Sequence, residues 1–359
     1  METNPQPPAV VKTQVTDKQI IRTILYRTTF VYTLFQLLLL IFMHLVGERY
    51  WLLSILIYLP VMFWLLPLGV LTPFCLIYRP KLCLWHLGCL LFTLFYYQTF
   101  HWNNGASPKN ETLILLTNNI ANNNRQSVEP YIKAENPDII ALQEATGRSN
   151  LYAKTYPDRF VSGINQFVLI SKFPIISTTI VNTPLWLGQP VAARFEISVH
   201  GENIAVYSIH LPTPRPDFVK LRGTGWLRES LGPSWNRKRS DGRSYRESMA
   251  ARVELARGLV SRISEEKEPF FLMGDFNMPD CGYIHSLFSA KFEDAFASAG
   301  RGWGLTFPGF GNHAFLMRGP WLRIDYLFAG RGWKTVDCHT EPDRRSKHRA
   351  VVARFERLP

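Results

Sequence analysis

The chain of 359 residues contains only five cysteines, and the spacings that mark common zinc and nucleophile sites are missing. No CxxC or HExxH pair is present, so a zinc site is not expected. The glycine-rich Walker loop and the GxSxG elbow of serine hydrolases are also absent. These absences argue against P-loop nucleotide hydrolysis and against serine-hydrolase chemistry.

Charge is missing from three long stretches near the N-terminus, which contain no Asp, Glu, Lys or Arg: residues 28–46, 50–78 and 82–100. A helix that crosses a bilayer needs about 20 apolar residues, and each stretch approaches or exceeds that length. Pro60 and Pro67 weaken the middle stretch, although helices in bilayers tolerate proline. We therefore expect a cytoplasmic tail at 1–27 and a membrane anchor at 28–101, with three transmembrane helices near 28–46, 51–72 and 82–100.

The basic residues around these stretches predict the orientation of the anchor. Six precede the first stretch or lie between the second and third, namely Lys12, Lys18, Arg22, Arg27, Arg79 and Lys81. Only Glu48 and Arg49 lie between the first and second stretches. Because basic segments stay in the cytoplasm, the N-terminus is expected there. The prediction is a multi-pass protein of the cell membrane whose remaining domain, residues 110–359, is extracytoplasmic.

Acidic residues are scarce relative to basic ones, with 28 Asp and Glu against 40 Lys and Arg and a net charge of +12. Much of the excess lies at 212–246, where Trp226 and Trp235 stand among arginines and lysines. A basic segment with interleaved tryptophans can bind a nucleic-acid strand or lie on an anionic lipid surface. It can also be a solvated insertion without a ligand.

Short apolar runs separated by turn residues predict strands at 113–116, 139–142, 167–170, 191–197, 204–209, 270–273, 324–328 and 351–355. Helices are expected at 127–135 and 245–265, and the latter has apolar residues along one face. Strands interleaved with a few helices favour an α/β domain in which two sheets pack face to face with helices outside.

Polar residues at the ends of these runs are the candidates for a site. Asp275 and Asn277 follow the run 270–273, and residues two apart in an extended chain point the same way. Both could instead make an Asx-type turn with the local backbone. Five further polar residues stand at or near the ends of other runs, namely Asn119, Glu144, His210, Asp325 and His348. Six strand ends could therefore converge on one edge of the sandwich.

In these motifs and in their order, residues from about 112 to 357 resemble the endonuclease/exonuclease/phosphatase superfamily. These DNase I-like proteins are metal-dependent phosphoesterases that include abasic-site endonucleases, sphingomyelinases and inositol-polyphosphate phosphatases. The resemblance implies a four-layer α/β sandwich of two packed mixed β-sheets.

The resemblance also implies roles for the polar residues. Glu144 would hold Mg²⁺ or Mn²⁺, which prefer oxygen ligands, and Asn119 would complete the metal shell or orient Glu144. Asp275 would orient or deprotonate the attacking water. Contacts to the scissile phosphate would come from Asn277 and His210. Acid-base or electrostatic work is implied for Asp325 and His348, the aspartate fixing the tautomer of the imidazole.

Two positions depart from the family pattern. The residue before the last histidine is usually acidic and is Lys347 here, while Ala121 replaces a residue that is acidic in some nucleases. Both changes remove negative charge near the metal, so we expect a single ion. Lys347 is also a candidate for binding substrate, together with Arg323, Arg246, Trp226 and Trp235.

The function expected from the sequence is a membrane-anchored, Mg²⁺-dependent phosphodiesterase that acts on nucleic acid. One alternative is a sphingomyelinase-type phosphodiesterase of lipid headgroups, which the nearby bilayer would supply with substrate. The other is a weak or inactive protein that binds polyanions at the membrane. The expected partners are thus a phosphate-ester substrate and the lipid bilayer, and no protein partner is indicated.

Overall fold

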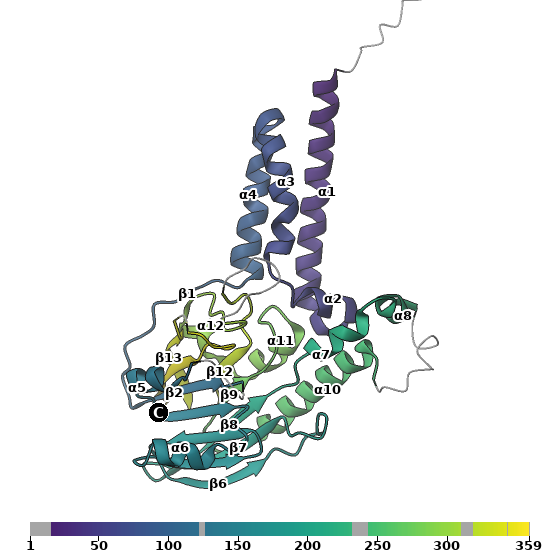
Figure 1. The fold of residues 1–359 in the computed structure, drawn as a ribbon. Helices are drawn as coiled ribbons and strands as arrows, with labels where there is room; N and C mark the ends of the chain where they lie inside the picture. The colour runs from purple at the N-terminus through teal and green to yellow at the C-terminus, as the bar shows by residue number, and fades with distance from the viewer. Residues whose placement is uncertain (1–15, 122–125, 232–242, 310–318, 343, 359) are drawn as a thin grey trace, which may run out of the picture. The chain divides into compact units, whose positions relative to one another are not determined.

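The fold was analysed in a computed structural model, which describes residues 16–121, 126–231, 243–309, 319–342 and 344–358. The chain divides into two compact units (Figure 1). The first comprises Met1–Leu40 and Met62–Thr93, and the second comprises Ile41–Val61 and Leu94–Pro359. Residues 41–61 therefore belong to the second unit, although the residues before and after them belong to the first.

The first unit is built from α1 (Asp17–Leu45), α3 (Met62–Tyr78), a 3-10 turn (Pro80–Leu82) and α4 (Cys83–Leu91). Within the described residues, only α1 is both long and apolar enough to cross a membrane. The helix α3 is apolar but has only 17 residues. The prediction of three transmembrane helices is therefore corrected to one helix of sufficient length.

The boundaries of the predicted spans also change. The predicted middle helix, 51–72, is broken into α2 (Trp51–Leu56) and α3, because Pro60 lacks an N–H group and disfavours helical backbone before it. The predicted third helix, 82–100, is α4 followed by a π-helical turn at Phe92–Tyr97. A 3-10 turn at Gly47–Arg49 precedes α2.

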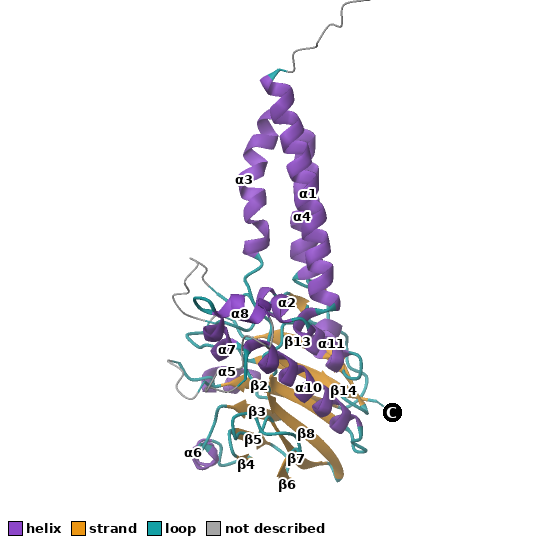
Figure 2. Cartoon of the chain, turned by 90° about the vertical axis from the view of Figure 1, so that its right-hand side faces the viewer, coloured by secondary structure: helices purple, strands orange, loops and turns teal. Residues whose placement is uncertain are grey.

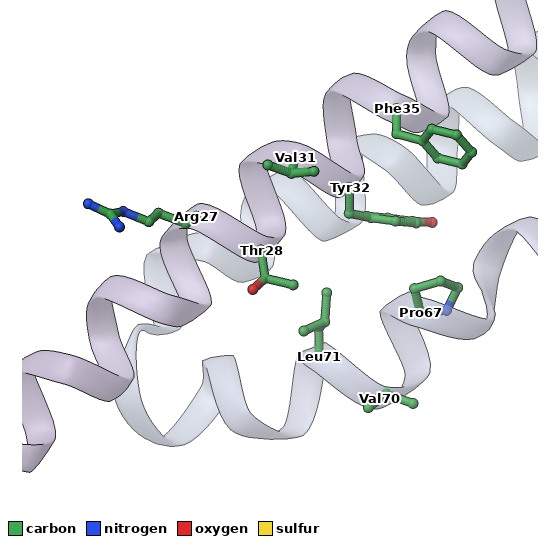
Figure 3. A pocket seen from close by; sticks show the side chains of 8 residues that line it. All are labelled: Arg27, Thr28, Val31, Tyr32, Phe35, Pro67, Val70 and Leu71. Atoms are coloured by element: carbon green, nitrogen blue, oxygen red, sulfur yellow. The ribbon is translucent and has the colours of Figure 1, made fainter.

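Polar side chains connect the helices of the first unit. The buried His86 lies 3.2 Å through Nε2 from Oγ1 of Thr29 and 2.8 Å through Nδ1 from Oγ1 of Thr72. A groove of about 660 Å³ lies between α1 and α3. Tyr32 and Leu71 point into this groove, whereas Arg27 points away from it (Figure 3). The groove is predominantly apolar, and this unit contains none of the predicted site residues.

The second unit contains two six-stranded sheets (Figure 2). The first has the order β10-β12-β9-β8-β7-β6, with β10 (Glu293–Asp294), β12 (Asp325–Ala329), β9 (Phe270–Asp275), β8 (Glu202–His210), β7 (Ala192–Val199) and β6 (Ile175–Ile180). The second has the order β13-β14-β2-β3-β5-β4, with β13 (Trp333–Thr340), β14 (Val351–Arg357), β2 (Thr112–Asn119), β3 (Ile139–Gln143), β5 (Phe167–Ser171) and β4 (Phe160–Ile164). Both sheets are mixed, because β8 pairs with β9 and β2 with β3 in parallel, whereas their other neighbours are antiparallel.

Helices cover the outer faces of the two sheets. Those of the first sheet are α10 (Tyr245–Ser264) and α11 (Tyr283–Ser289), while α5 (Glu129–Glu135) and α6 (Ser149–Thr155) cover the second. The remaining short elements are α7 (Arg215–Phe218), a 3-10 turn (Val219–Leu221), α8 (Gly225–Leu231), α12 (Ala295–Ala299), and the two-residue strands β1 (His101–Trp102) and β11 (Arg301–Gly302), which pair with each other.

The alternating directions of side chains along the central strands explain how sheets and helices form layers. In β9, Phe271 and Met273 pack into the core between the sheets, whereas Phe270 and Leu272 face the helices α10 and α11. Because successive side chains of a strand point to opposite faces, a continuous apolar run fits a strand covered on both sides. The predicted four-layer α/β sandwich of two mixed sheets is confirmed.

Candidate active site

The predicted site residues meet where strands of both sheets end or begin. Asn119 is the last residue of β2, and Glu144 directly follows β3. In the other sheet, His210 and Asp275 end the parallel neighbours β8 and β9 and are paired in register. Asp325 begins β12 and pairs with Asp275 across the antiparallel ladder. The backbone alone thus brings these side chains to one edge of the sandwich.

Gly274 allows the close approach of the two parallel strands at this edge. Its φ is +148°, and a Cβ atom added there would lie 1.9 Å from the carbonyl oxygen of Ile209. A side chain at this position would therefore push β8 and β9 apart. The glycine keeps His210 next to Asp275.

Asp275 is the centre of the cluster and is 1% exposed. Its Oδ2 accepts a 2.9 Å hydrogen bond from Nδ2 of Asn119, and its Oδ1 accepts one from the backbone N–H of Asn277, also at 2.9 Å. Nε2 of His210 lies 3.7 Å from Oδ2, and Nε2 of His348 lies 3.8 Å from it. Both imidazoles therefore face the same carboxylate oxygen.

His348 and Asp325 form a buried pair. Nδ1 of His348 lies 3.0 Å from Oδ2 and 3.2 Å from Oδ1 of Asp325, which leaves Nε2 directed toward Asp275. The ring of Phe307 packs against the imidazole with the centroids 4.8 Å apart. Burial lowers the pKa of His348, but the charges of Asp325 and Asp275 outweigh it and raise the pKa to about 9. The neighbouring carboxylates therefore favour the protonated imidazole.

The carboxylates of the cluster are short of compensating charge. Burial raises the pKa of Asp275, and the opposing effect of His348 does not cancel it. Within the described part of the chain, neither Asp275 nor Asp325 pairs with a lysine or an arginine. A buried group of this kind is typical of a site that binds a cation or moves a proton.

The oxygen donors at this edge fit a hard divalent cation. Nδ2 of Asn119 donates to Asp275 and, at 3.2 Å, to Oε1 of Glu144, so one amide holds two carboxylates side by side. Carboxylate oxygens are the ligands that Mg²⁺ prefers. Oδ1 of Asn119 accepts a 2.8 Å hydrogen bond from the backbone N–H of Ala121. A second possible set is Asp275, Asp325 and His348, whose ligand atoms lie within 4.8 Å of one another.

Left-handed backbone occurs at this edge at Ala121, Glu144 and Asn277, with φ of +49°, +53° and +47°. Such values are uncommon outside glycine and persist where surrounding contacts hold them. Nδ2 of Asn277 donates to the carbonyl of Leu211 at 2.9 Å, so the loops after β8 and β9 are tied together.

Among the predicted substrate-binding residues, Arg323 requires a correction. Its side chain is 3% exposed, and its guanidinium contacts Asp294 at 2.8 Å and Asp280 at 3.4 Å. Both carboxylates belong to a separate buried cluster, so Arg323 is not available to a substrate. Its sequence position, two residues before Asp325, suggested the site but does not place it there.

Three of the other predicted substrate-binding residues, Lys347, Arg246 and Trp226, lie at the surface. Lys347 is exposed beside the buried His348, and its carbonyl accepts a 2.6 Å hydrogen bond from the backbone of Gly309. Arg246 is exposed in the first turn of α10, with its guanidinium 5.9 Å from the ring centroid of Trp51. Trp226 is 57% exposed on α8, and Trp235 lies outside the described residues.

The structure adds residues that the sequence did not indicate. Oε1 of Gln166 lies 2.6 Å from Nδ1 of His210 and orients that ring. Beside Asn277 and Phe307 there is a pocket of about 180 Å³, lined by Tyr58, Thr213, Pro214, Arg215, Phe218, Asn277, Phe307, Trp321, Leu322 and Ile324. The guanidinium of Arg215 lies 4.9 Å from the centroid of the Phe307 ring. These residues come from loops distant in sequence, so no local pattern could have grouped them.

Comparisons with known proteins agree with the domain that contains this site. The model of the Endonuclease/Exonuclease/phosphatase family matches residues 114–347. No curated protein sequence matches the chain.

Several solved structures are similar to the chain at low identity. An endonuclease/exonuclease/phosphatase from Beutenbergia cavernae DSM 12333 is 17% identical, with a TM-score of 0.45. The matched region covers 68% of this chain and 72% of the Beutenbergia chain. A family protein from Leptotrichia buccalis C-1013-b is 16% identical over 68% of this chain and 99% of its own, with a TM-score of 0.48. TDP2 of D. rerio, solved with a single strand DNA product, is 12% identical over 68% and 99%, with a TM-score of 0.49.

Proposed function

Because the chain belongs to the endonuclease/exonuclease/phosphatase family, we propose that its second unit is a metal-dependent phosphodiesterase with Asp275 at the centre of the site. The observation that carries the proposal is the environment of this carboxylate. It is buried, faces His210 and His348, and has no lysine or arginine partner within the described residues.

The metal would be held by Glu144, with Asn119 fixing the carboxylate and Asp275 close by. A bound Mg²⁺ or Mn²⁺ supplies positive charge that neutralises a phosphate and favours attack by a nucleophile. The neighbouring Lys347 carries charge where the family pattern usually has an acid, which supports a single ion.

Hydrolysis requires a base for the attacking water and a donor for the leaving oxygen. Asp275 accepts the proton of the water as the oxygen–phosphorus bond forms, because a carboxyl group with a raised pKa is a stronger base than an ordinary aspartate. His348 is cationic and held by Asp325, so it stabilises the anionic phosphate and gives its proton to the alkoxide as the ester bond breaks. In this mechanism His210 and Asn277 hold the phosphate oxygens.

We infer that the chain is anchored in a membrane through its first unit. The support is α1, an apolar helix of 29 residues. The predicted topology, with a cytoplasmic N-terminus and an extracytoplasmic catalytic unit, remains part of this proposal.

Nucleic acid is the preferred substrate in this proposal. The exposed Trp226 and Arg215 offer the aromatic and basic contacts that bind a strand. A membrane anchor would instead favour a lipid phosphodiester, and the experiment below separates the two.

The test is hydrolysis by the full chain in detergent of a chromogenic diester, of single-stranded and plasmid DNA, and of phospholipid vesicles. Each substrate is incubated with Mg²⁺ and with EDTA, and Glu144→Gln is the matched variant. We expect turnover that requires the metal and falls at least about a hundredfold in the variant. Turnover that persists equally in EDTA and in Glu144→Gln would exclude the proposed chemistry.

A further inference from the structure

Residues 46–58, which lie between α1 and α3, are packed into the second unit, which contains the candidate active site. The carboxylate of Glu48 is 1% exposed and accepts a 3.2 Å hydrogen bond from the backbone N–H of Ile284. A Cβ atom added at Gly282 would lie 2.6 Å from this carboxylate, so the segments around Glu48 and Gly282 are in close contact. The hydroxyl of Ser54 lies 2.9 Å from that of Tyr245, and both side chains are fully buried. The segment is therefore an integral part of the second unit.

The end of this segment reaches the catalytic loop. The hydroxyl of Tyr58 donates a 2.9 Å hydrogen bond to the carbonyl oxygen of Asn277. Arg252, from α10, donates to the same carbonyl through Nη2 at 2.8 Å and to the hydroxyl of Tyr58 through Nη1 at 3.1 Å. Its Nε donates to the carbonyl of Pro212 at 2.7 Å. One buried arginine and one tyrosine thus connect the loops that follow β8 and β9.

These contacts hold the backbone of Asn277. Its φ of +47° lies in the left-handed region, which asparagine adopts more readily than most residues with a side chain. Its N–H donates to Asp275 and its side chain donates to Leu211, so the position of Asn277 is linked to the central carboxylate. A shift of its carbonyl would move the N–H that holds Oδ1 of Asp275.

We propose that Tyr58 is a positioning residue of the active site, which holds Asn277, and through it Asp275, from a segment that lies outside the matched family region. Its kinetic consequence rests on the proposed phosphodiesterase function. In this role Tyr58 makes no hydrogen bond to Asp275 and acts through the backbone carbonyl of Asn277. The same tyrosine lines the pocket beside the site together with Arg215 and Phe307.

Charge inside the second unit supports this role of the segment. Burial lowers the pKa of Arg252, which is 2% exposed, but the effects of Tyr58 and Glu48 outweigh burial and raise it. A buried guanidinium without compensating charge is unfavourable. A protein piece that starts near Asn110 would lose Glu48 and Tyr58 together. The proposed catalytic unit therefore includes residues 46–58 as well as the chain from Leu94 onward.

The test compares Tyr58→Phe with Tyr207→Phe in the full chain in detergent. Each variant removes one hydroxyl, and that of Tyr207 donates to Glu266 at 2.7 Å, away from the proposed catalytic groups. Loss of a hydrogen bond that positions a catalytic loop should lower kcat for a chromogenic diester about tenfold. KM should change less than about twofold, because the substrate contacts remain. Tyr207→Phe should keep the wild-type kcat.

A second readout does not depend on turnover. Hydrogen exchange at the backbone amides of Phe276 and Asn277 should be faster in Tyr58→Phe than in wild type and in Tyr207→Phe. A kcat within twofold of wild type, or an equal loss in both variants, would overturn the positioning role while the proposed function stands. If the wild type hydrolyses no diester, the proposed function fails, and exchange alone decides: unchanged protection in Tyr58→Phe then rejects the inference.

Discussion

Among the described residues of the second unit, two buried clusters of aspartate and histidine differ in how their charges are balanced. Around Asp294, Nη1 of Arg323 lies 2.8 Å from one carboxylate oxygen, and Nε2 of His285 lies 2.9 Å from the same oxygen. Burial raises the pKa of Asp294, but Arg323 and His285 outweigh it and hold the pKa well below its usual range. Around Asp275 the balance is reversed, and burial keeps the pKa raised.

The comparison separates a structural cluster from a chemical one. Asp294 is satisfied by an arginine and also caps α12 through the N–H groups of Phe296 and Ala297. Asp275 faces histidines, an amide and another carboxylate, all of which leave negative charge for a cation or a proton. The same residue types therefore stabilise the fold in one place and form the proposed catalytic site in the other.

The largest expected effect is on activity. Asp275→Asn should lower kcat about a thousandfold, because it removes the proposed base without changing the shape of the side chain. Asp294→Asn is the matched control and should retain activity per folded molecule within about twofold. Diester hydrolysis by both variants measures the difference, and more than a tenth of wild-type turnover in Asp275→Asn would contradict the assignment.

The next effect is on stability and has the opposite pattern. Asp294→Asn leaves Arg323 buried without its main partner and should lower the free energy of unfolding by about 3 kcal/mol. Asp275→Asn should change it by less than about 1 kcal/mol, since its carboxylate has no lysine or arginine partner in the described residues. Urea unfolding followed by tryptophan fluorescence tests this contrast. Equal losses of unfolding free energy in the two variants would contradict it.

Metal should stabilise only through the chemical cluster. Mg²⁺ at about 100 times its Kd should raise the free energy of unfolding by about 2.7 kcal/mol in wild type and in Asp294→Asn. Glu144→Gln should lose this increment, because it removes the proposed ligand charge. Thermal unfolding with and without Mg²⁺ provides the measurement, and an increment of the same size in Glu144→Gln would place the ion elsewhere.

The smallest expected effect is on how steeply the stability falls at acidic pH. The folded pKa of Asp294 is depressed below its ordinary value of 3.8, so its contribution is present above that value and is lost as the pH falls further. Asp294→Asn should therefore show a shallower decline of Tm than wild type below about pH 4. Parallel curves for the two proteins would show that this carboxylate does not contribute to acid unfolding.

The sequence predicted the interior of the sandwich better than its margins. All eight predicted strands exist, and they are the inner strands of the two sheets. The strands β4, β6, β10 and β13 were missed, and each is at the edge of a sheet. Edge strands such as β6 are only partly buried and carry polar residues, so they lack the continuous apolar run that identifies an inner strand.

The polar strand ends were also predictable, because parallel neighbours end at one edge of a sheet. Arg323 was misassigned because its partner, Asp294, is distant in sequence and gives no local signal. The segment 46–58 was interpreted as loop and membrane helix, since Trp51 to Tyr58 is apolar. Its packing against α10 depends on tertiary contacts such as that between Ser54 and Tyr245, which no sequence window contains.

The two sheets repeat one order of strand pairings: antiparallel, antiparallel, parallel, antiparallel and antiparallel. At or near the ends of corresponding strands are Asn119 and Asp275, Glu144 and His210, and His348 and Asp325. The backbone is thus duplicated while the side chains are not. A nearly symmetric arrangement of strands therefore carries an asymmetric set of acids and bases, and in the proposed mechanism these six side chains would give a substrate its direction across the site.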